Sequence, residues 1–140
     1  MYNMGSVYTE ITLKNAIDNG LVQRGSLKKE DVRQTTFTAL VDTGAYTLVI
    51  NEKIFAELGL KAVGTRRVNL ADGGSVDCKE TEPVEICWKN RSCTFSAWVL
   101  QNADEMLLGV IPLLYMDLIV NPLKQELVGA HGDLVLGKIK

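Results

Sequence analysis

The chain has 140 residues, of which 46% are hydrophobic and 23% are charged, which suits one globular domain and leaves no room for a second. The formal net charge of -2 and the scattered lysines and arginines argue against nucleic acid and against polybasic membrane binding. No stretch approaches the ~20 apolar residues of a membrane span, and the first residues lack a basic region followed by an apolar run. We therefore expect a single domain over residues 1–140, a cytoplasmic location, and neither a nucleic-acid nor a membrane partner.

The first third of the chain predicts two strands separated by an irregular segment. Residues 7–13 alternate between apolar and polar side chains, which is typical of a half-buried strand. Residues 14–34 contain Asn19-Gly20 and Gly25-Ser26 and show little apolar periodicity, so they predict a surface excursion that is partly a hairpin. Residues 32–41 then return as a strand.

An acid stands in the apolar stretch that follows. Residues 37–50 read FTALVDTGAYTLVI, in which Asp42 is alone among apolar and β-branched neighbours. The flanks have strand composition, whereas Asp42-Thr43-Gly44 has turn composition. Burying a carboxylate costs several kcal/mol unless hydrogen bonds or a pKa shift offset the cost. We interpret Asp42 as a functional acid on a tight loop between buried strands; the alternative is a structural aspartate in an Asx turn.

A short helix and two hairpins are predicted next. Asn51 is a good N-cap and Gly59 suits the position after a helix, so a helix is expected over residues 52–58. Residues 66–70 and 75–79 alternate and are joined by a turn that contains Asp-Gly, a strong hairpin signal. Residues 84–88 and 93–99 predict a second hairpin.

The last part of the chain begins with a fully apolar run. Residues 106–111 predict a central buried strand that ends at Pro112. A short helix is expected over residues 113–118, with Pro112 in its first turn. Residues 127–128 and 134–136 predict C-terminal strands.

The cysteines and the histidine give no sign of a metal site. Cys78, Cys87 and Cys93 lack the spacing of a zinc or redox motif, so buried free thiols are expected. Cys87 and Cys93 flank a predicted turn and could face each other across the hairpin. His131 has no nearby cysteine or histidine, and we interpret it as a turn residue.

The order of these motifs resembles a known family. Asp42-Thr43-Gly44-Ala45 follows Ala39-Leu40-Val41 and precedes Leu107-Leu108-Gly109, as in the retropepsin-like aspartic proteases of the single-domain bacterial and archaeal type. The resemblance covers roughly residues 39–122. It implies a mostly-β fold, namely a closed acid-protease β-barrel with one or two short helices. Two-lobed pepsin-like enzymes carry two Asp-Thr-Gly loops, and this chain carries one. The resemblance therefore implies an active site built from two identical chains.

The resemblance also implies roles for individual residues. The catalytic residue is Asp42, and the residues that support the active site are Thr43, Gly44, Ala45, Leu107, Leu108 and Gly109. Gly109 would allow the last apolar strand to touch the acid loop. Asp72, Gly73 and Gly74 would form the flap over the substrate; an ordinary surface hairpin is the alternative. The implied activity is that of an aspartic endopeptidase, a homodimer that cleaves a peptide or protein with no metal and no cofactor. The competing interpretation is a non-catalytic dimerisation or peptide-binding module with the same fold.

Two positions depart from the pattern of the family. Retroviral members often carry an acid after Asp-Thr-Gly-Ala and an arginine after the apolar-apolar-Gly element, and these two residues pair. The corresponding residues here are Tyr46 and Val110. Because both partners of the ion pair are absent, neither leaves an unpaired charge behind, and the fold is not destabilised. We expect the dimer edge to be braced differently, with residues 121–140 and the N-terminal excursion as candidate surfaces.

Overall fold

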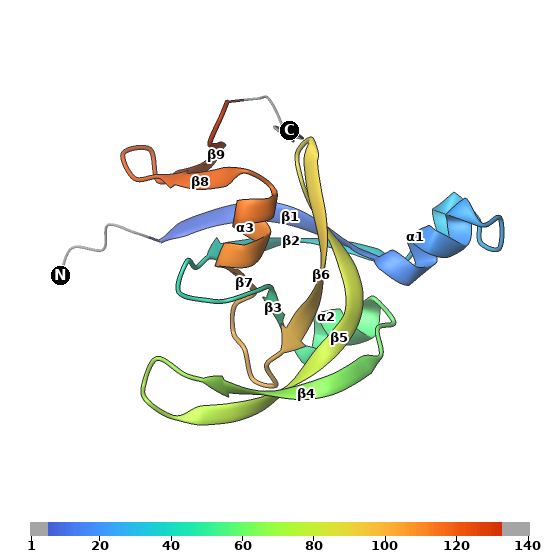
Figure 1. Ribbon diagram of the computed structural model, residues 1–140, viewed down its shortest axis with the longest axis horizontal. Coiled ribbons are helices and arrows are strands. Elements are labelled where there is room, and N and C mark those ends of the chain that lie inside the picture. The colour runs from blue at the N-terminus through green and yellow to red at the C-terminus, as the bar shows by residue number, and fades with distance from the viewer. Residues whose placement is uncertain (1–5, 133–140) are drawn as a thin grey trace, which may run out of the picture.

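The computed structural model describes residues 6–132, and strands make up most of the regular structure (Figure 1). The strands are β1 (Val7–Asn15), β2 (Gln34–Val41), β3 (Val49–Ile50), β4 (Ala62–Asn69), β5 (Ser75–Trp88), β6 (Arg91–Val99), β7 (Leu107–Leu108), β8 (Leu118–Asn121) and β9 (Glu126–Gly129). The helices are α1 (Ala16–Gln23), α2 (Glu52–Glu57) and α3 (Val110–Tyr115), with a 3-10 turn η1 (Lys29–Asp31). The predicted mostly-β class is confirmed, although the described residues hold three α-helices where one or two are expected.

The first seven strands form one sheet that closes on itself. Their order is β1-β2-β7-β3-β6-β5-β4, and β1 pairs with β5 as well as with β2. The additional pairing joins residues 12–15 to residues 84–87 and turns the sheet into a barrel, and β4 pairs with residues 75–81, the first part of β5. Side chains from opposite walls fill the interior, among them Leu13, Ile50, Ile86 and Leu108, which are fully buried. The strand pairing is that of the predicted closed barrel.

The segment after β1 differs from the prediction, because it contains a helix rather than part of a hairpin. Asn15 caps α1, since its side chain accepts a hydrogen bond from the Asp18 backbone N–H at 3.0 Å. The buried Asp18 carboxylate in turn accepts hydrogen bonds from the backbone N–H, Nε and Nη2 of Arg33, at 2.9–3.0 Å. These bonds hold the pKa of Asp18 below its ordinary value. A cap and a buried ion pair therefore fix this helix, and apolar periodicity does not reveal either one.

Two predicted strands are halves of one. Residues 75–79 and 84–88 both belong to β5, which spans 14 residues. Its register against β6 shifts between Glu80 and Pro83, where the proline has no N–H to donate. The Thr81 hydroxyl accepts a hydrogen bond from the Ala97 N–H at 2.9 Å inside this irregularity. The bulge explains why the sequence pattern breaks although the strand continues.

The apolar run at residues 106–111 is only partly a strand. Leu107 and Leu108 form β7, and the chain then turns into α3, which begins at Val110. The predicted helix is present but starts three residues before the predicted start at Leu113, and Pro112 lies in its first turn as expected. The predicted strand at residues 127–128 lies within β9, whereas the one at residues 134–136 falls outside the described residues.

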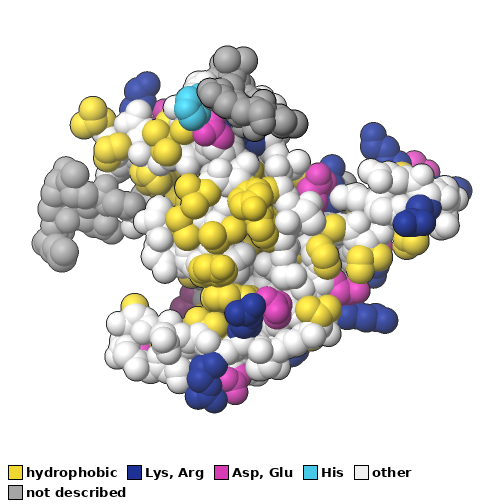
Figure 2. Space-filling view, viewed as in Figure 1, with side chains coloured by type: hydrophobic (Ala, Val, Ile, Leu, Met, Phe, Trp, Pro, Cys, Tyr) yellow, Lys and Arg dark blue, Asp and Glu magenta, His cyan; other side chains and the backbone are white. Residues whose placement is uncertain are grey.

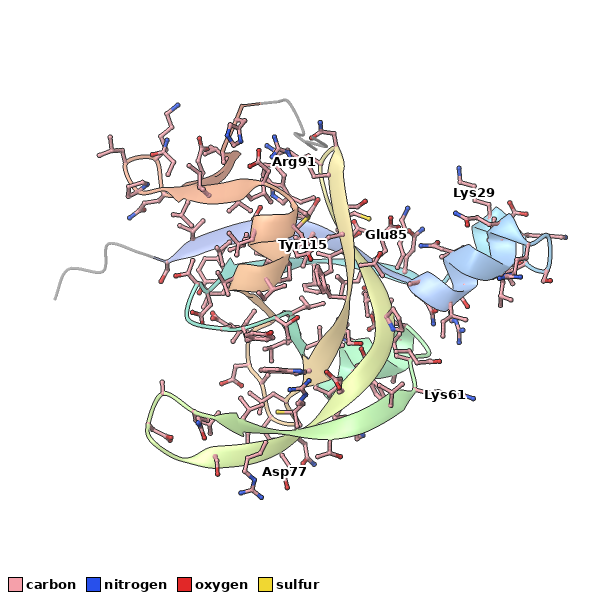
Figure 3. The ribbon with its side chains drawn as sticks, viewed as in Figure 1. Lys29, Lys61, Asp77, Glu85, Arg91 and Tyr115 are labelled. Atoms are coloured by element: carbon pink, nitrogen blue, oxygen red, sulfur yellow. The ribbon has the colours of Figure 1, made fainter. Side chains whose placement is uncertain are left out.

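A buried arginine anchors the β8–β9 hairpin to the barrel. Arg91 begins β6, and its Nη1 donates to the carbonyl oxygens of Met116 and Asp117 at 2.9 and 2.7 Å (labelled in Figure 3). Its Nη2 donates to the Gly132 carbonyl oxygen. His131 lies in the turn that follows β9, as predicted, and its Nδ1 is 2.8 Å from an Asp117 carboxylate oxygen. The buried Arg91 guanidinium thus links the last described residues and the base of the β8–β9 hairpin to β6 of the main sheet.

The three cysteines are free, and the suggested approach of Cys87 and Cys93 is wrong. Cys87 lies opposite Ser92 and Cys93 lies opposite Ile86. Partners across an antiparallel pair project to the same face, so the two thiols project to opposite faces. Burial raises the pKa of the Cys93 thiol to about 12, which keeps it protonated and unreactive.

Within residues 6–132, no group of three histidine, cysteine or acidic side chains is arranged to hold a metal ion. No helix in the same range has the length and apolar character needed to cross a membrane. Apolar side chains do reach the surface over α3 and β8 (Figure 2), including Leu114, Tyr115 and Ile119, which are 67%, 71% and 51% exposed. The surface over α3 and β8 therefore carries several exposed apolar side chains.

Candidate active site

The acid loop begins where β2 ends, and its backbone fixes the direction of the Asp42 side chain. The Asp42 N–H donates to the Leu108 carbonyl oxygen at 3.0 Å, and the Ala45 N–H donates to the Asp42 carbonyl oxygen at 3.0 Å. The Gly44 N–H donates to Asp42 Oδ1 at 2.9 Å. This last bond is also the signature of an Asx turn. The hydrogen bond alone therefore fits both a functional and a structural aspartate, and the surroundings of the carboxylate must distinguish them.

The loop is less buried than its sequence suggests. Asp42 is half-buried in the single chain, and Thr43 and Gly44 are exposed. The Asp42 carboxylate is therefore only partly buried in this chain, because the strand residues Val41 and Thr47 to Ile50 are buried and the turn between them projects outward.

The chain threads back through this region along β7. Leu107 pairs with Leu40 of β2 in parallel and with Val49 of β3 in antiparallel orientation, so β7 lies between the strands on either side of the acid loop. After β7, the Val110 N–H donates to the Ala45 carbonyl oxygen at 2.9 Å. The backbone of the next turn is thereby fastened to the acid loop.

Gly109 makes this close passage possible. A Cβ atom on Gly109 would lie 2.3 Å from the Thr47 carbonyl oxygen and 2.7 Å from the Ala45 carbonyl oxygen. Real side chains do not tolerate such separations from backbone atoms, so residue 109 must be glycine if the loop is to keep its place. The two backbones touch here, as the family resemblance implies.

A groove of about 520 Å³ runs beside the acid loop. Its lining residues come from the loop, from β4 with the start of its turn, and from the sheet between them, namely Asp42, Gly44, Ala45, Tyr46, Val49, Arg67, Val68, Asn69, Leu70, Ala71, Cys78, Trp98, Leu100 and Leu107. Most of these side chains are apolar. Asp42 and Arg67 are the charged members, and the Arg67 guanidinium pairs with Asp77 of β5 at 3.1 Å.

The predicted flap is the tip of the β4–β5 hairpin. In Figure 1 this tip lies at the lower left, on the same side of the molecule as the loop after β2. Asp72 Oδ1 accepts a hydrogen bond from the Gly74 N–H at 2.8 Å, and Gly73 has a φ of 91°. The groove is lined by the residues just before the tip, up to Ala71, and not by Asp72, Gly73 or Gly74. In the single chain the tip thus extends past the groove.

An aromatic pair that sequence reasoning did not identify forms one wall of the groove. The rings of Tyr46 and Trp98 are stacked, with centroids 5.6 Å apart and planes 10° from parallel. Trp98 lies opposite Val49 in the β3–β6 pairing, far from Tyr46 in the sequence. Only the position of Tyr46 beside the Asp-Thr-Gly motif could have drawn attention to it, and nothing in the sequence singles out Trp98.

A closed barrel whose Asp-Thr-Gly loop is flanked by a threaded strand defines a retropepsin-like aspartic protease fold. The family model of the gag-polyprotein putative aspartyl proteases matches residues 30–113, so the chain belongs to this family. Among solved structures, the fold is similar to that of EIAV protease complexed with the inhibitor HBY-793, with a TM-score of 0.54 and 21% sequence identity. That match covers 81% of this chain and 91% of the other. No curated protein matches the chain.

Proposed function

We propose that the chain is an aspartic endopeptidase whose active site is shared by two identical chains, each contributing one Asp42. Family membership and fold support the protease assignment. The observation that carries the shared site is the composition of the groove, in which Asp42 is the one carboxylate among the described lining residues. Peptide hydrolysis by this class needs two carboxylates, so a second copy of the loop must supply the other one.

The proposed chemistry follows from bringing two carboxylates together. As is known for aspartic-protease dyads, two such groups cannot both ionise, so they hold one proton between them. The ionised Asp42 takes a proton from a bound water while the water oxygen attacks the scissile carbonyl carbon, and the protonated Asp42 gives its proton to the carbonyl oxygen. Collapse of the tetrahedral intermediate, a gem-diol, breaks the C–N bond: the carboxyl that took the proton from water gives it to the leaving nitrogen, and the other carboxylate takes a proton from one hydroxyl group as its oxygen re-forms the carbonyl. The dyad then again holds one proton.

The remaining predicted site residues take supporting roles in this proposal. The exposed Thr43 side chain is placed at the outer turn of the loop, where it can bond the partner loop. An extended peptide lies along the groove between the acid loop and the β4–β5 hairpin, and its main chain bonds to these elements as an added strand. Asp72, Gly73 and Gly74 form the tip that moves over the bound peptide. Neither a metal nor an organic cofactor takes part.

The dimer edge beside the loop cannot use the acid–arginine pair of retroviral members, since Tyr46 and Val110 occupy these positions. Tyr46 is 60% exposed and Val110 is half-buried in the single chain. An apolar edge requires no compensating charge when a second copy covers it. Val110 supplies such an apolar position in this proposal, whereas the Tyr46 ring remains at the wall of the groove that it lines.

The Asp42→Asn variant tests the proposal directly. An amide has nearly the shape of a carboxylate but cannot act as the base, so peptide cleavage should fall by a factor of ~10²–10⁴ or more. Sedimentation should show that the variant remains dimeric, because removing a like-charge pair does not weaken the association. Equal cleavage of a broad peptide library by wild type and variant would refute the role of Asp42. Binding of peptides by both, with cleavage by neither, would favour the non-catalytic module, for which the bond between Asp42 and Gly44 is purely structural.

A further inference from the structure

Tyr46 and Trp98 stand out because their stacked rings border the groove rather than the core. Tyr46 is 60% exposed, and Trp98 is half-buried. Neither belongs to the buried cluster that fills the barrel. Trp88, the other tryptophan, shows the contrast, since it is 6% exposed and its Nε1 donates to Thr9 Oγ1 at 2.7 Å. An aromatic pair beside the acid loop that does little for the core is available to a ligand.

The backbone holds the two rings in place from both sides. The Tyr46 carbonyl oxygen accepts a hydrogen bond from the Ile111 N–H at 3.1 Å, and the Trp98 N–H donates to the Leu48 carbonyl oxygen at 3.0 Å. The Thr47 hydroxyl donates to the Ser96 carbonyl oxygen at 3.2 Å. These bonds join the acid loop and β6 next to the stacked residues. The wall is therefore formed before any ligand arrives, which lowers the entropy lost on binding.

The surroundings of the pair favour an apolar ligand group. Val49, Leu100 and Leu107 line the same groove, and Cys78 adds a buried thiol. Arg67 is already paired with Asp77, with further contact from Nη2 to Asp77 Oδ2 at 3.4 Å. An acidic substrate side chain placed against the rings would lose hydration without gaining an unpaired cation as partner. A large aromatic or aliphatic side chain would instead gain stacking and burial.

We propose that Tyr46 and Trp98 form a subsite that selects an aromatic or large aliphatic side chain of the substrate close to the scissile bond. This inference rests on the proposed peptidase function, because it assigns the specificity of the same groove. Tyr46 lies four residues after Asp42, at a position where retroviral members often carry a pairing acid. In this chain the position serves substrate selection instead.

The test compares pairs of peptides that differ only by phenylalanine or alanine, placed in turn at each residue around the cleaved bond. The readout is the ratio of kcat/KM for the two peptides, which does not depend on how much active dimer is present. At one position wild type should prefer phenylalanine, and Tyr46→Ala and Trp98→Ala should each reduce that preference by about 10-fold. Trp98→Phe, which keeps an aromatic ring, should retain most of it.

Tyr115→Ala is the matched control. Tyr115 is also an exposed tyrosine with an aromatic neighbour. Its ring packs edge-on against the ring of Phe95, with the two ring centroids 4.8 Å apart. It lies on α3 beside β6 (Figure 3) and does not line the groove. Its removal should leave the phenylalanine preference unchanged.

The outcomes separate the subsite from the function itself. If Tyr46→Ala folds and cleaves with an unchanged preference, the subsite is refuted while the peptidase stands. Tyr46 suits this purpose because an exposed side chain can be removed with little effect on folding. A loss of preference in Tyr115→Ala as large as in Tyr46→Ala would also refute it. A wild type that cleaves no peptide, and whose Asp42→Asn variant is indistinguishable from it, would overturn the proposed function and the subsite with it.

Discussion

Gly109 and Thr47 are in backbone contact so close that a Cβ on Gly109 would lie 2.3 Å from the Thr47 carbonyl oxygen. This contact fastens the strand β7 and the start of α3 against the loop that carries Asp42. The geometry of the acid loop therefore depends on a residue that is distant in sequence and has no side chain.

Gly109→Ala should destabilise the protein, because the new methyl group must displace backbone atoms rather than a flexible side chain. We expect the free energy of unfolding to fall by about 1–3 kcal/mol or more, measured by denaturant titration. Gly20→Ala is the control, since Gly20 lies within α1 and a Cβ there would meet no atom within 4 Å. That substitution should stabilise the helix by roughly 0.5–1 kcal/mol. Two changes of the same sign and size would contradict the close contact.

Arg33→Gln should lower the free energy of unfolding at neutral pH, and it should lower it less at acidic pH. Arg33 holds the pKa of Asp18 below its ordinary value through side-chain hydrogen bonds. A carboxyl with a lowered native pKa stabilises the fold above its unfolded pKa of ~3.9, and loses this contribution as the pH falls through the native pKa. At pH 7 we expect a loss of about 1–3 kcal/mol, kept moderate because the Arg33 side chain is half-exposed.

Denaturant titrations of wild type and Arg33→Gln at pH 7 and at decreasing pH below 4 measure this effect. The difference between the two proteins should shrink as the pH falls. Arg67→Gln provides the control, because the ion pair of Arg67 with Asp77 is exposed on both sides. Its removal should change the stability by less than about 1 kcal/mol. A difference between wild type and Arg33→Gln that stays constant with pH would mean that the ionisation of Asp18 is not coupled to folding.

The flap assignment predicts that Gly73→Val impairs turnover without unfolding the protein. Gly73 has a φ of 91°, which a valine rarely adopts, so the tip would be forced to change shape. A misplaced tip should lower kcat/KM by about 10- to 100-fold. Gly25→Val is closely matched, with a φ of 79° and no atom within 4 Å of its Cβ, but it lies in the segment after α1. Equal activity of the two variants would reduce the β4–β5 tip to an ordinary surface turn.

Much of this fold can be predicted from sequence, because local signals and the final structure agree. Asn51 caps α2 through a 2.9 Å hydrogen bond from the Ile54 N–H, where the N-cap pattern predicts it. The Asp-Gly turn between β4 and β5 also agrees with its sequence signal. The helix α1 could not be predicted, because the Arg33 side chain that holds Asp18 comes from beyond the helix. The single long β5 was missed because Pro83 interrupts the local pattern while Thr81 and Ala97 maintain the contact between strands.

Some residues of the candidate site can be predicted from the sequence, and others cannot. The Asp-Thr-Gly motif and Gly109 can be found by their residue types and order, since the chemistry and the close backbone contact each demand a particular residue. Trp98 cannot be found in this manner, because its place beside Tyr46 is set by the parallel pairing of β3 with β6. The wall of the groove is a property of the strand order, and sequence spacing does not encode it.

The shared site is the central claim, and mixing two proteins tests it most directly. Wild type and Asp42→Asn are combined at constant total concentration, allowed to exchange partners, and assayed for peptide cleavage as the wild-type fraction decreases. If a pair of chains needs both carboxylates, activity follows the square of the wild-type fraction, so an equimolar mixture retains about a quarter of the wild-type activity. Activity that instead falls in direct proportion to the wild-type fraction, leaving half in the equimolar mixture, would show that each chain works alone and would contradict the shared site.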